Sequence, residues 1–141
     1  MGADMGLRTV KAKRSPYQIP GQHNTLTSTI VIGAEAANVI LVTLTLKDLG
    51  RKTLAKAAGV RAWLSDSATT GAVIAAAPSG GVALGVGSVI APVVAGKVLD
   101  VVTSTGGVAR FDVTEVGAKT CYLWVLFPDG STKVSGAITF A

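Results

Sequence analysis

The sequence has little charge, few aromatic side chains, one cysteine and one histidine. Charged residues make up 15% of the 141 residues, against roughly 25% in typical soluble domains, and aromatic residues make up 5%. The single cysteine, Cys121, excludes a disulfide within the chain. The single histidine, His23, lies far from it in the sequence, which excludes a His/Cys metal cluster. We therefore expect no metal and no cofactor.

The sequence also lacks the residue groupings on which common enzymes depend. Histidine is the commonest general base, and the only one lies in the N-terminal segment. No nucleophile elbow, phosphate-binding loop or dinucleotide-binding glycine pattern occurs. The carboxylates fall mostly at expected strand ends or exposed alternating positions, and nothing in their spacing indicates a glycosidase pair. We expect that the protein is not an enzyme.

One long stretch, from Ser67 to Gly96, contains no charged residue, and the mean hydropathy of the chain is +0.52. A membrane-spanning helix needs about 20 predominantly apolar residues. This stretch is interrupted by helix-breaking residues: Pro78, Pro92, Gly71, Gly80, Gly81, Gly85, Gly87 and Gly96. We therefore expect short strands and turns here rather than a membrane segment. The first thirty residues lack the apolar core of a signal peptide.

The N-terminal quarter differs from the rest in charge and pattern. The formal net charge is +5, and residues 1–34 supply +3 of it. No helical or alternating pattern appears before residues 26–32, which form a candidate first strand. We expect an extended basic arm over residues 1–34, followed by a single domain over residues 35–141. The candidate partner-contact residues of the arm are Arg8, Lys11, Lys13, Arg14 and Tyr17.

From Asn38 onward the hydrophobic pattern has a period of two. Val42 and Leu44 face one way while Thr43 and Thr45 face the other, as in a half-buried strand. Residues 51–58 are the only candidate helical turn, and a long hairpin connection is the alternative. Further strands are predicted at 40–47, 60–65, 72–77, 82–86, 89–94, 97–103, 108–113, 119–127 and 131–140.

Turn signals every 8–12 residues and the near absence of helical pattern predict an all-β fold. The expected architecture is an antiparallel β-sandwich, jelly-roll-like or immunoglobulin-like. The residues expected in its core are Val42, Leu44, Leu64, Phe111, Leu123, Val125 and Ile138.

The predicted strand 119–127 is apolar on both faces, which indicates burial on both sides. Leu123, Val125 and Phe127 share the face of Cys121, which we expect to be a small buried hydrophobic residue. The opposite face needs a second cover, either another subunit or the N-terminal arm. The candidate subunit-interface residues are Tyr122, Trp124 and Leu126.

Four segments, 60–66, 77–83, 127–130 and 134–141, resemble the cement (decoration) proteins of short-tailed bacteriophages. The resemblance covers residues 38–141 and leaves out the N-terminal arm. It implies a jelly-roll sandwich that dimerises on the exterior of the virion capsid. Its partners would be the major capsid protein and a second copy of itself, and its function would be to stabilise the shell by bridging capsid subunits.

Two other functions fit the sequence less well. A receptor- or carbohydrate-binding sandwich, such as a fibre or adhesin module, needs exposed aromatic residues, and only Trp63 and Trp124 are candidates. A nucleic-acid-associated virion protein could use the basic arm together with Arg51, Lys52 and Lys56, since phosphate binding needs only positive charge. The exposed aromatic platform of single-strand binders is missing, so nucleic acid is the least favoured partner, and no membrane is expected.

Overall fold

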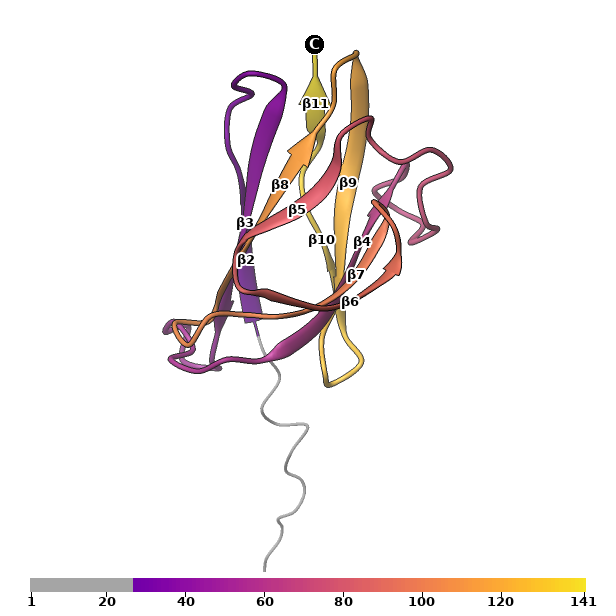
Figure 1. Ribbon diagram of the computed structural model, residues 1–141. Helices are drawn as coiled ribbons and strands as arrows, with labels where there is room; N and C mark the ends of the chain where they lie inside the picture. Colours follow the sequence, from indigo (N-terminus) through magenta and orange to yellow (C-terminus); the bar gives the residue numbers. More distant parts are fainter. Residues whose placement is uncertain (1–26) are drawn as a thin grey trace, which may run out of the picture.

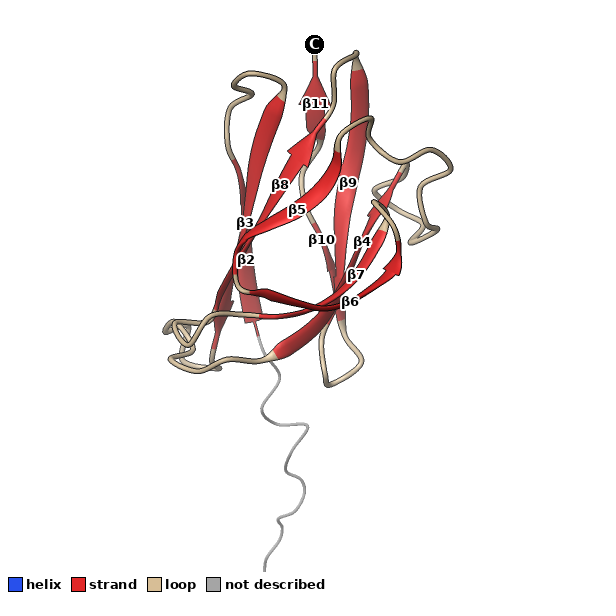
Figure 2. Cartoon of the chain, viewed as in Figure 1, coloured by secondary structure: helices blue, strands red, loops and turns tan. Residues whose placement is uncertain are grey.

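The computed structural model describes residues 27–141, which fold into ten β-strands with no helix (Figures 1 and 2). In these residues, accordingly, no helix is long and apolar enough to cross a membrane. The strands are β2 (Thr27–Ile32), β3 (Val39–Lys47), β4 (Gly59–Ser65), β5 (Gly81–Val86), β6 (Ser88–Val94), β7 (Val98–Val102), β8 (Val108–Thr114), β9 (Lys119–Leu126), β10 (Thr132–Val134) and β11 (Ile138–Phe140).

The strands form two antiparallel sheets, the arrangement of a β-sandwich. The four-stranded sheet has the order β2-β3-β8-β5. The six-stranded sheet has the order β10-β9-β4-β7-β6, and β11 also pairs with β9. The chain passes from β5 in one sheet to β6 in the other through the single residue Gly87, whose φ of +92° favours glycine. The all-β antiparallel fold predicted from the sequence is confirmed, and its jelly-roll topology stays a prediction.

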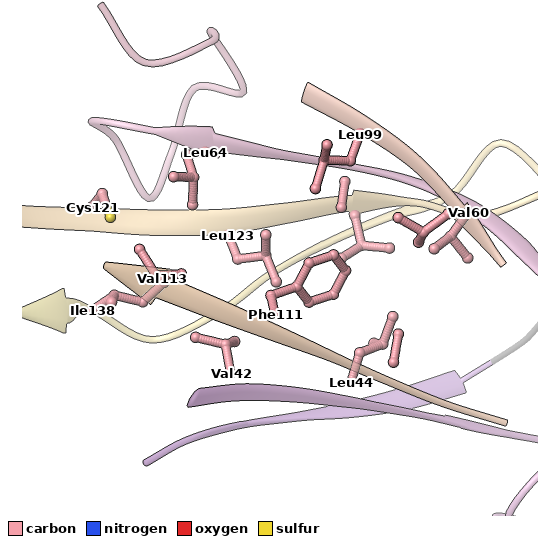
Figure 3. Close-up of a cluster of buried hydrophobic side chains, with 14 of the residues drawn as sticks. Val42, Leu44, Val60, Leu64, Leu99, Phe111, Val113, Cys121, Leu123 and Ile138 are labelled. Carbon is pink, nitrogen blue, oxygen red and sulfur yellow. The ribbon is translucent and has the colours of Figure 1, made fainter. Parts of the chain in front are cut away.

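The core lies between the sheets, and all seven residues expected in it are buried. Phe111 of β8 is fully buried, and it points from the four-stranded sheet towards Leu123 of β9 (Figure 3). Val42, Phe111 and Ile32 lie on the same face of the four-stranded sheet. The strand register explains this, because Val42 lies opposite Phe111 on one side and opposite Ile32 on the other. Alternation along each strand therefore selects the same residues that the period-two pattern predicted.

The predicted first strand at 26–32 is confirmed as β2, which pairs along its whole length with β3. Residues 1–26 lie outside the described part of the chain. The arm candidates Arg8, Lys11, Lys13 and Arg14, together with Tyr17, belong to that segment, so the arm stays a prediction.

The predicted helical turn at residues 51–58 is wrong, and so is its alternative, a long hairpin connection. The segment is irregular and leads from β3 in one sheet to β4 in the other. Lys47 forms a bridge with Thr53, and the Leu54 N–H donates to the Leu46 carbonyl at 2.9 Å. Arg51 has a φ of +65°, which no right-handed helix accommodates.

The predicted strand at 72–77 is also wrong, because this segment is a loop with no ladder partner. Its backbone groups bond elsewhere. The Ala75 N–H donates to the Asp66 carboxylate at 3.2 Å, and the Lys97 ammonium donates to the Ala75 carbonyl at 2.8 Å. Only Ile74 is fully buried, and its N–H donates to the Leu64 carbonyl at 2.8 Å. Two side chains and one backbone carbonyl of β4 thus replace a strand ladder here.

The predicted strand at 131–140 is divided into β10 and β11, which both pair antiparallel with β9. The division falls at Ser135, whose hydroxyl accepts the Leu123 N–H at 2.9 Å and donates to the Gly136 carbonyl at 2.7 Å. A buried side chain therefore replaces one step of the backbone ladder, and the chain continues in the same direction along β9.

Candidate interaction surfaces

Two tryptophans lie next to each other on the outer face of the six-stranded sheet. Trp63 of β4 and Trp124 of β9 lie directly opposite each other in the strand register. Their rings stack with centroids 6.2 Å apart and an angle of 14° between the ring planes. We call these two residues the tryptophan pair. Offset stacking at this separation adds to the stability gained by burying the rings.

The loop of residues 66–71 packs over the tryptophan pair. The Trp63 indole N–H donates to the Gly71 carbonyl at 2.8 Å, and the Trp124 indole N–H donates to the Ser67 carbonyl at 2.9 Å. A Cβ atom at Gly71 would lie 3.4 Å from Trp63 and 3.6 Å from Trp124, so the loop backbone contacts both rings. The chain itself therefore supplies part of the cover that the sequence predicted for this face of β9.

The 66–71 loop is held in shape by its own hydroxyl groups. The Ser67 hydroxyl accepts the N–H groups of Thr69 and Thr70, both at 3.1 Å, and the Ser65 hydroxyl donates to the Thr70 carbonyl at 3.1 Å. Such short-range bonds between side chain and backbone stabilise turns. This cover could not be predicted from the sequence, because a short polar loop has no periodicity that reveals where it packs.

The three interface candidates on β9 lie side by side in the sheet but are not fully open. Tyr122, Trp124 and Leu126 are each half-buried, and they alternate with Cys121, Leu123 and Val125, which face the core. Burial raises the pKa of the Cys121 thiol to about 11, which keeps it protonated at neutral pH.

Each sheet carries one arginine on its outer face, and each arginine is paired with an aspartate. Arg61 donates two hydrogen bonds to Asp100, at 2.7 and 2.8 Å, and Arg110 donates two to Asp112, at 2.8 and 3.0 Å. The Arg61 hydrogen bond lowers the pKa of Asp100, and the Asp112 bond raises the pKa of Arg110. These exposed pairs contribute little to stability. Their effect is to neutralise the charge of these two outward arginines, while Lys47 of β3 shares the outward face of Thr43 and Thr45.

The outer face of the four-stranded sheet exposes apolar and hydroxyl-bearing side chains. Val31 of β2 is 62% exposed and Leu41 of β3 is 39% exposed. Thr29, Thr43 and Thr45 share this face, since the register places Val31 opposite Thr43 and Thr29 opposite Thr45. We call Val31, Leu41 and these three threonines the β2–β3 surface.

A second apolar surface lies along β6, the edge strand of the six-stranded sheet next to β7. Val89, Ile90, Val93 and Val94 are 43%, 65%, 46% and 43% exposed. We call these four residues the β6 surface. The sequence predicted a strand here, and Pro92 in its middle is a signal of an edge strand that the prediction did not use. Because strand order follows from long-range pairing, the β6 surface became visible only in the fold.

Hydrogen bonds between Glu115 and Ser79 join two loops at one end of the sandwich, and we call this arrangement the carboxylate clamp. Glu115 accepts the Ser79 N–H at 3.2 Å and the Gly117 N–H at 3.1 Å, and the Ser79 hydroxyl accepts the Val116 N–H at 2.9 Å. Hydrogen bonds from Gly117 and Ser79 lower the pKa of Glu115. Among the residues that the structure describes, no three His, Cys, Asp or Glu side chains are grouped so that they could hold a metal ion.

Comparison with known proteins assigns the chain to no family. No protein-family model matches the sequence, and no curated protein matches it.

Proposed function

We propose that this protein is a cement protein, which binds the outer surface of an assembled tailed-phage capsid and bridges major capsid protein subunits. The observation that carries the proposal is the presence of two separate apolar surfaces on one tightly packed β-sandwich. The β2–β3 surface lies at one side of the four-stranded sheet, and the β6 surface lies at the edge of the other sheet. A bridging protein needs at least two contact surfaces held in fixed geometry.

The electrostatics of the outer faces suit contact with other proteins. Desolvating an unpaired charge is costly, and the central parts of interfaces are depleted in charged residues. In this chain the outward arginines Arg61 and Arg110 are each bound by an aspartate. The surfaces can therefore be buried mainly through apolar area and shape. On a symmetric shell, many such modest contacts add up through multivalency.

The β2–β3 surface is the one we assign to the shell. The basic residues of the predicted arm precede Thr27, the first residue of β2, in the chain. Contacts made by the arm and contacts made by Val31 of β2 would therefore fall on neighbouring parts of one partner. The arm adds positive charge for an acidic shell, and its candidate contacts remain Arg8, Lys11, Lys13, Arg14 and Tyr17.

The tryptophan pair supports this function over carbohydrate binding. Both indole N–H groups already donate to carbonyls of the 66–71 loop, and the rings stack on each other and against Gly71. A sugar-binding platform needs a free ring face and a free polar edge. In this chain the two tryptophans hold a loop in place.

Co-sedimentation with capsids tests the proposal. Particles stripped of the protein are mixed with the full chain, pelleted and assayed for bound protein. We expect the chain to pellet with shells but not with dispersed capsid subunits. The double variant Val31→Glu/Leu41→Glu should bind at least about tenfold more weakly, a loss of about 1.4 kcal/mol.

Two further variants complete the experiment. Val116→Glu changes an apolar residue that is 68% exposed but lies outside both surfaces, so it should bind as the unchanged chain does. Replacing Arg8, Lys11, Lys13 and Arg14 by alanine should weaken binding and reduce its salt dependence. Failure of the unchanged chain to pellet with shells would contradict the proposal.

A further inference from the structure

We propose that residues 17–23 of this chain add a strand to the open edge of β2 and so extend the four-stranded sheet. These residues lie outside the described part of the chain and precede Thr27, the first residue of β2. The inference goes beyond the proposed function and does not depend on it.

The edge at β2 differs from the other sheet edges of the described chain. Proteins protect sheet edges with prolines, bulges, charges and short strands. β6 carries Pro92 and two register shifts, β5 shifts register after Leu84, and the edge beside β9 is divided into the three-residue strands β10 and β11. β2 has no proline and no charge, and its six residues pair with β3 without a shift (Figure 1). An edge of this kind accepts another strand.

The inward face of β2 is incompletely covered. Ser28, Ile30 and Ile32 point into the sandwich, because the register places each of them opposite a fully buried residue of β3. Ile30 and Ile32 are nevertheless only half-buried. The Ser28 hydroxyl is buried and has no hydrogen-bond partner among the residues that the structure describes. A buried polar group without a partner is costly, so this hydroxyl indicates a further neighbour of β2.

The backbone of β2 has its unpaired groups at the same three positions. Gly33, which follows β2 directly, donates its N–H to the Leu41 carbonyl of β3 at 2.8 Å. Backbone groups alternate between the two sides of an antiparallel strand, so those of Ser28, Ile30 and Ile32 point away from β3. An added strand therefore hydrogen-bonds to these three residues.

The segment that contains Tyr17 and Ile19 fits this edge. Antiparallel pairing can place Ile19 opposite Ile30. Tyr17 then lies opposite Ile32, and the two apolar side chains cover the two half-buried isoleucines. Two apolar residues are too few to predict a strand by themselves, and the edge that they match became visible only in the fold.

The same register brings a partner to the Ser28 hydroxyl. Gly21 lies opposite Ser28 and adds no side chain there. The next residue on that face is His23, whose neutral imidazole both donates and accepts hydrogen bonds. Asn24 and Thr25 then form the hairpin loop, and two residues is the commonest length for such a loop.

Pro16 and Pro20 are compatible with this register. Residues 17, 19 and 21 direct their N–H groups towards β2, so the nitrogens of the two prolines point away from it. Proline is accepted at such positions of an edge strand, where it also opposes pairing with a further strand. A shift by one residue would instead direct both proline nitrogens at β2, where an N–H is needed.

Other occupants fit the edge less well. A strand over residues 8–14 would carry Lys11 and Lys13 on one face and Arg8 and Arg14 on the other, so either orientation would bury charge. A strand from a second copy or from another protein loses translational freedom on binding. A segment joined to Thr27 by a short loop acts at a high effective concentration instead.

The added strand changes the expected path of the arm. Because it runs antiparallel to β2, Tyr17 lies next to Ile32, and residues 8–14 leave the sheet at the end where β2 finishes. Tyr17 then belongs to the fold and is no longer a capsid contact. The four basic residues of the arm start near Val31 of the β2–β3 surface.

Disulfide trapping in the full chain tests the register. Gln18 lies opposite Val31, with both side chains outward and a Cα separation of about 4.5 Å, which a disulfide can span. Gln18→Cys/Val31→Cys should therefore form an intramolecular disulfide under mild oxidation. In the control Gln18→Cys/Thr29→Cys, the second cysteine is equally on the exposed face of β2 but lies diagonally, about 7–8 Å away. The control should crosslink at least about tenfold more slowly. Cys121 is buried and does not compete.

Hydrogen exchange of the full chain measures the backbone pairing separately. The amides of Ile30 and Ile32 should be protected in the unchanged chain. They should exchange at least about tenfold faster in Ile19→Pro, which loses the N–H that faces Ile30. Gln18→Pro is the matched control, because the N–H of residue 18 points away from β2, and it should keep the protection.

Equal crosslinking of the two cysteine variants would overturn the inference, and so would Ile30 and Ile32 amides that exchange equally fast in the unchanged chain and in Ile19→Pro. A disulfide-linked dimer would assign the strand to a second copy, and protection that appears only after shells are added would assign it to the capsid. Either result excludes docking within the chain. Trapping and exchange need no capsid, so their outcome is independent of the cement function.

Discussion

The indole rings of Trp63 and Trp124 stack 6.2 Å apart on the outer face of the six-stranded sheet, and each donates its N–H to the same loop. The two residues are far apart in the sequence and come together only because β4 pairs with β9. Their arrangement ties the 66–71 loop to two strands at once. It gives the outer face of the sheet a fixed shape without any contribution from a partner.

Removing one indole N–H should loosen this loop. Trp124→Phe keeps an aromatic ring on β9 but loses the donor to the Ser67 carbonyl, so we expect a loss of about 0.5–1.5 kcal/mol, the net worth of one hydrogen bond, plus some lost ring contact. Urea unfolding measures the loss, and hydrogen exchange of residues 67–71 should become faster. Tyr122→Phe, on the same face of β9, is the matched control and should change neither. Unchanged exchange in Trp124→Phe would mean that the tryptophan pair does not hold the loop.

The packed core should respond strongly to truncation. Phe111→Ala and Leu123→Ala remove side chains that are at most 2% exposed, and each should lower the free energy of unfolding by about 2–5 kcal/mol. Denaturant titration of the two variants provides the measurement. Val116→Ala, at a position that is 68% exposed, should change the free energy of unfolding by less than about 0.5 kcal/mol. Equal losses in core and control variants would show that the inward faces are wrongly assigned.

The turn between β2 and β3 contains residues that could be replaced to increase the stability of the fold. Ala37 and Asn38 have φ values of +51° and +67°, in the left-handed region, where alanine is unfavourable. Asn-Gly is the preferred pair for such two-residue hairpin turns. Ala37→Asn/Asn38→Gly should therefore raise the free energy of unfolding by about 0.5–1 kcal/mol. Thermal melts provide the measurement, and Ala34→Asn, at a position without a positive φ, is the control. A loss of stability in the double variant would contradict this description of the turn.

Glu115 should make stability depend on pH at the acidic end. Its folded-state pKa is lowered by hydrogen bonds from Gly117 and Ser79, so the unfolded chain binds the proton more readily. The stabilisation from Glu115 is fully present above the ordinary glutamate pKa of about 4.3 and is lost as the pH falls through the lowered folded pKa.

Urea unfolding of the unchanged chain and of Glu115→Gln, measured from about pH 7 to about pH 3, tests this dependence across the ordinary carboxyl pKa. The stability difference between the two proteins should be constant near neutral pH and shrink as the solution becomes more acidic. A difference that stayed constant or grew at low pH would exclude the carboxylate clamp as its cause.

Strands with clear alternation could be predicted from the sequence, and those without it could not. The period-two pattern around Val42 identified β3. The predictions for residues 51–58 and 72–77 were wrong because the backbone groups of these segments bond to distant partners that no local pattern encodes. Leu54 donates to the Leu46 carbonyl, and Ala75 donates to the Asp66 carboxylate.

The candidate surfaces were only partly predictable for the same reason. The two apolar faces of the strand 119–127 predicted a cover from another subunit or from the arm, and both stay predictions. The cover that the structure shows over Trp124 comes from a loop and depends on the distant carbonyl of Ser67. The exposure of Ile90 depends on β6 pairing with β7 alone, which is a property of the sheet order. Sequence periodicity identifies which face of a strand is apolar, while only the assembled sheets show which apolar face is left open.

The most direct test of the cement function is the temperature at which particles release their DNA. Mass action by a protein that binds only the assembled shell raises the resistance of that shell to heat. Stripped particles should release DNA at a lower temperature than decorated ones, and adding back the purified chain should restore the higher temperature. Identical release temperatures for stripped, decorated and restored particles would contradict the proposed function.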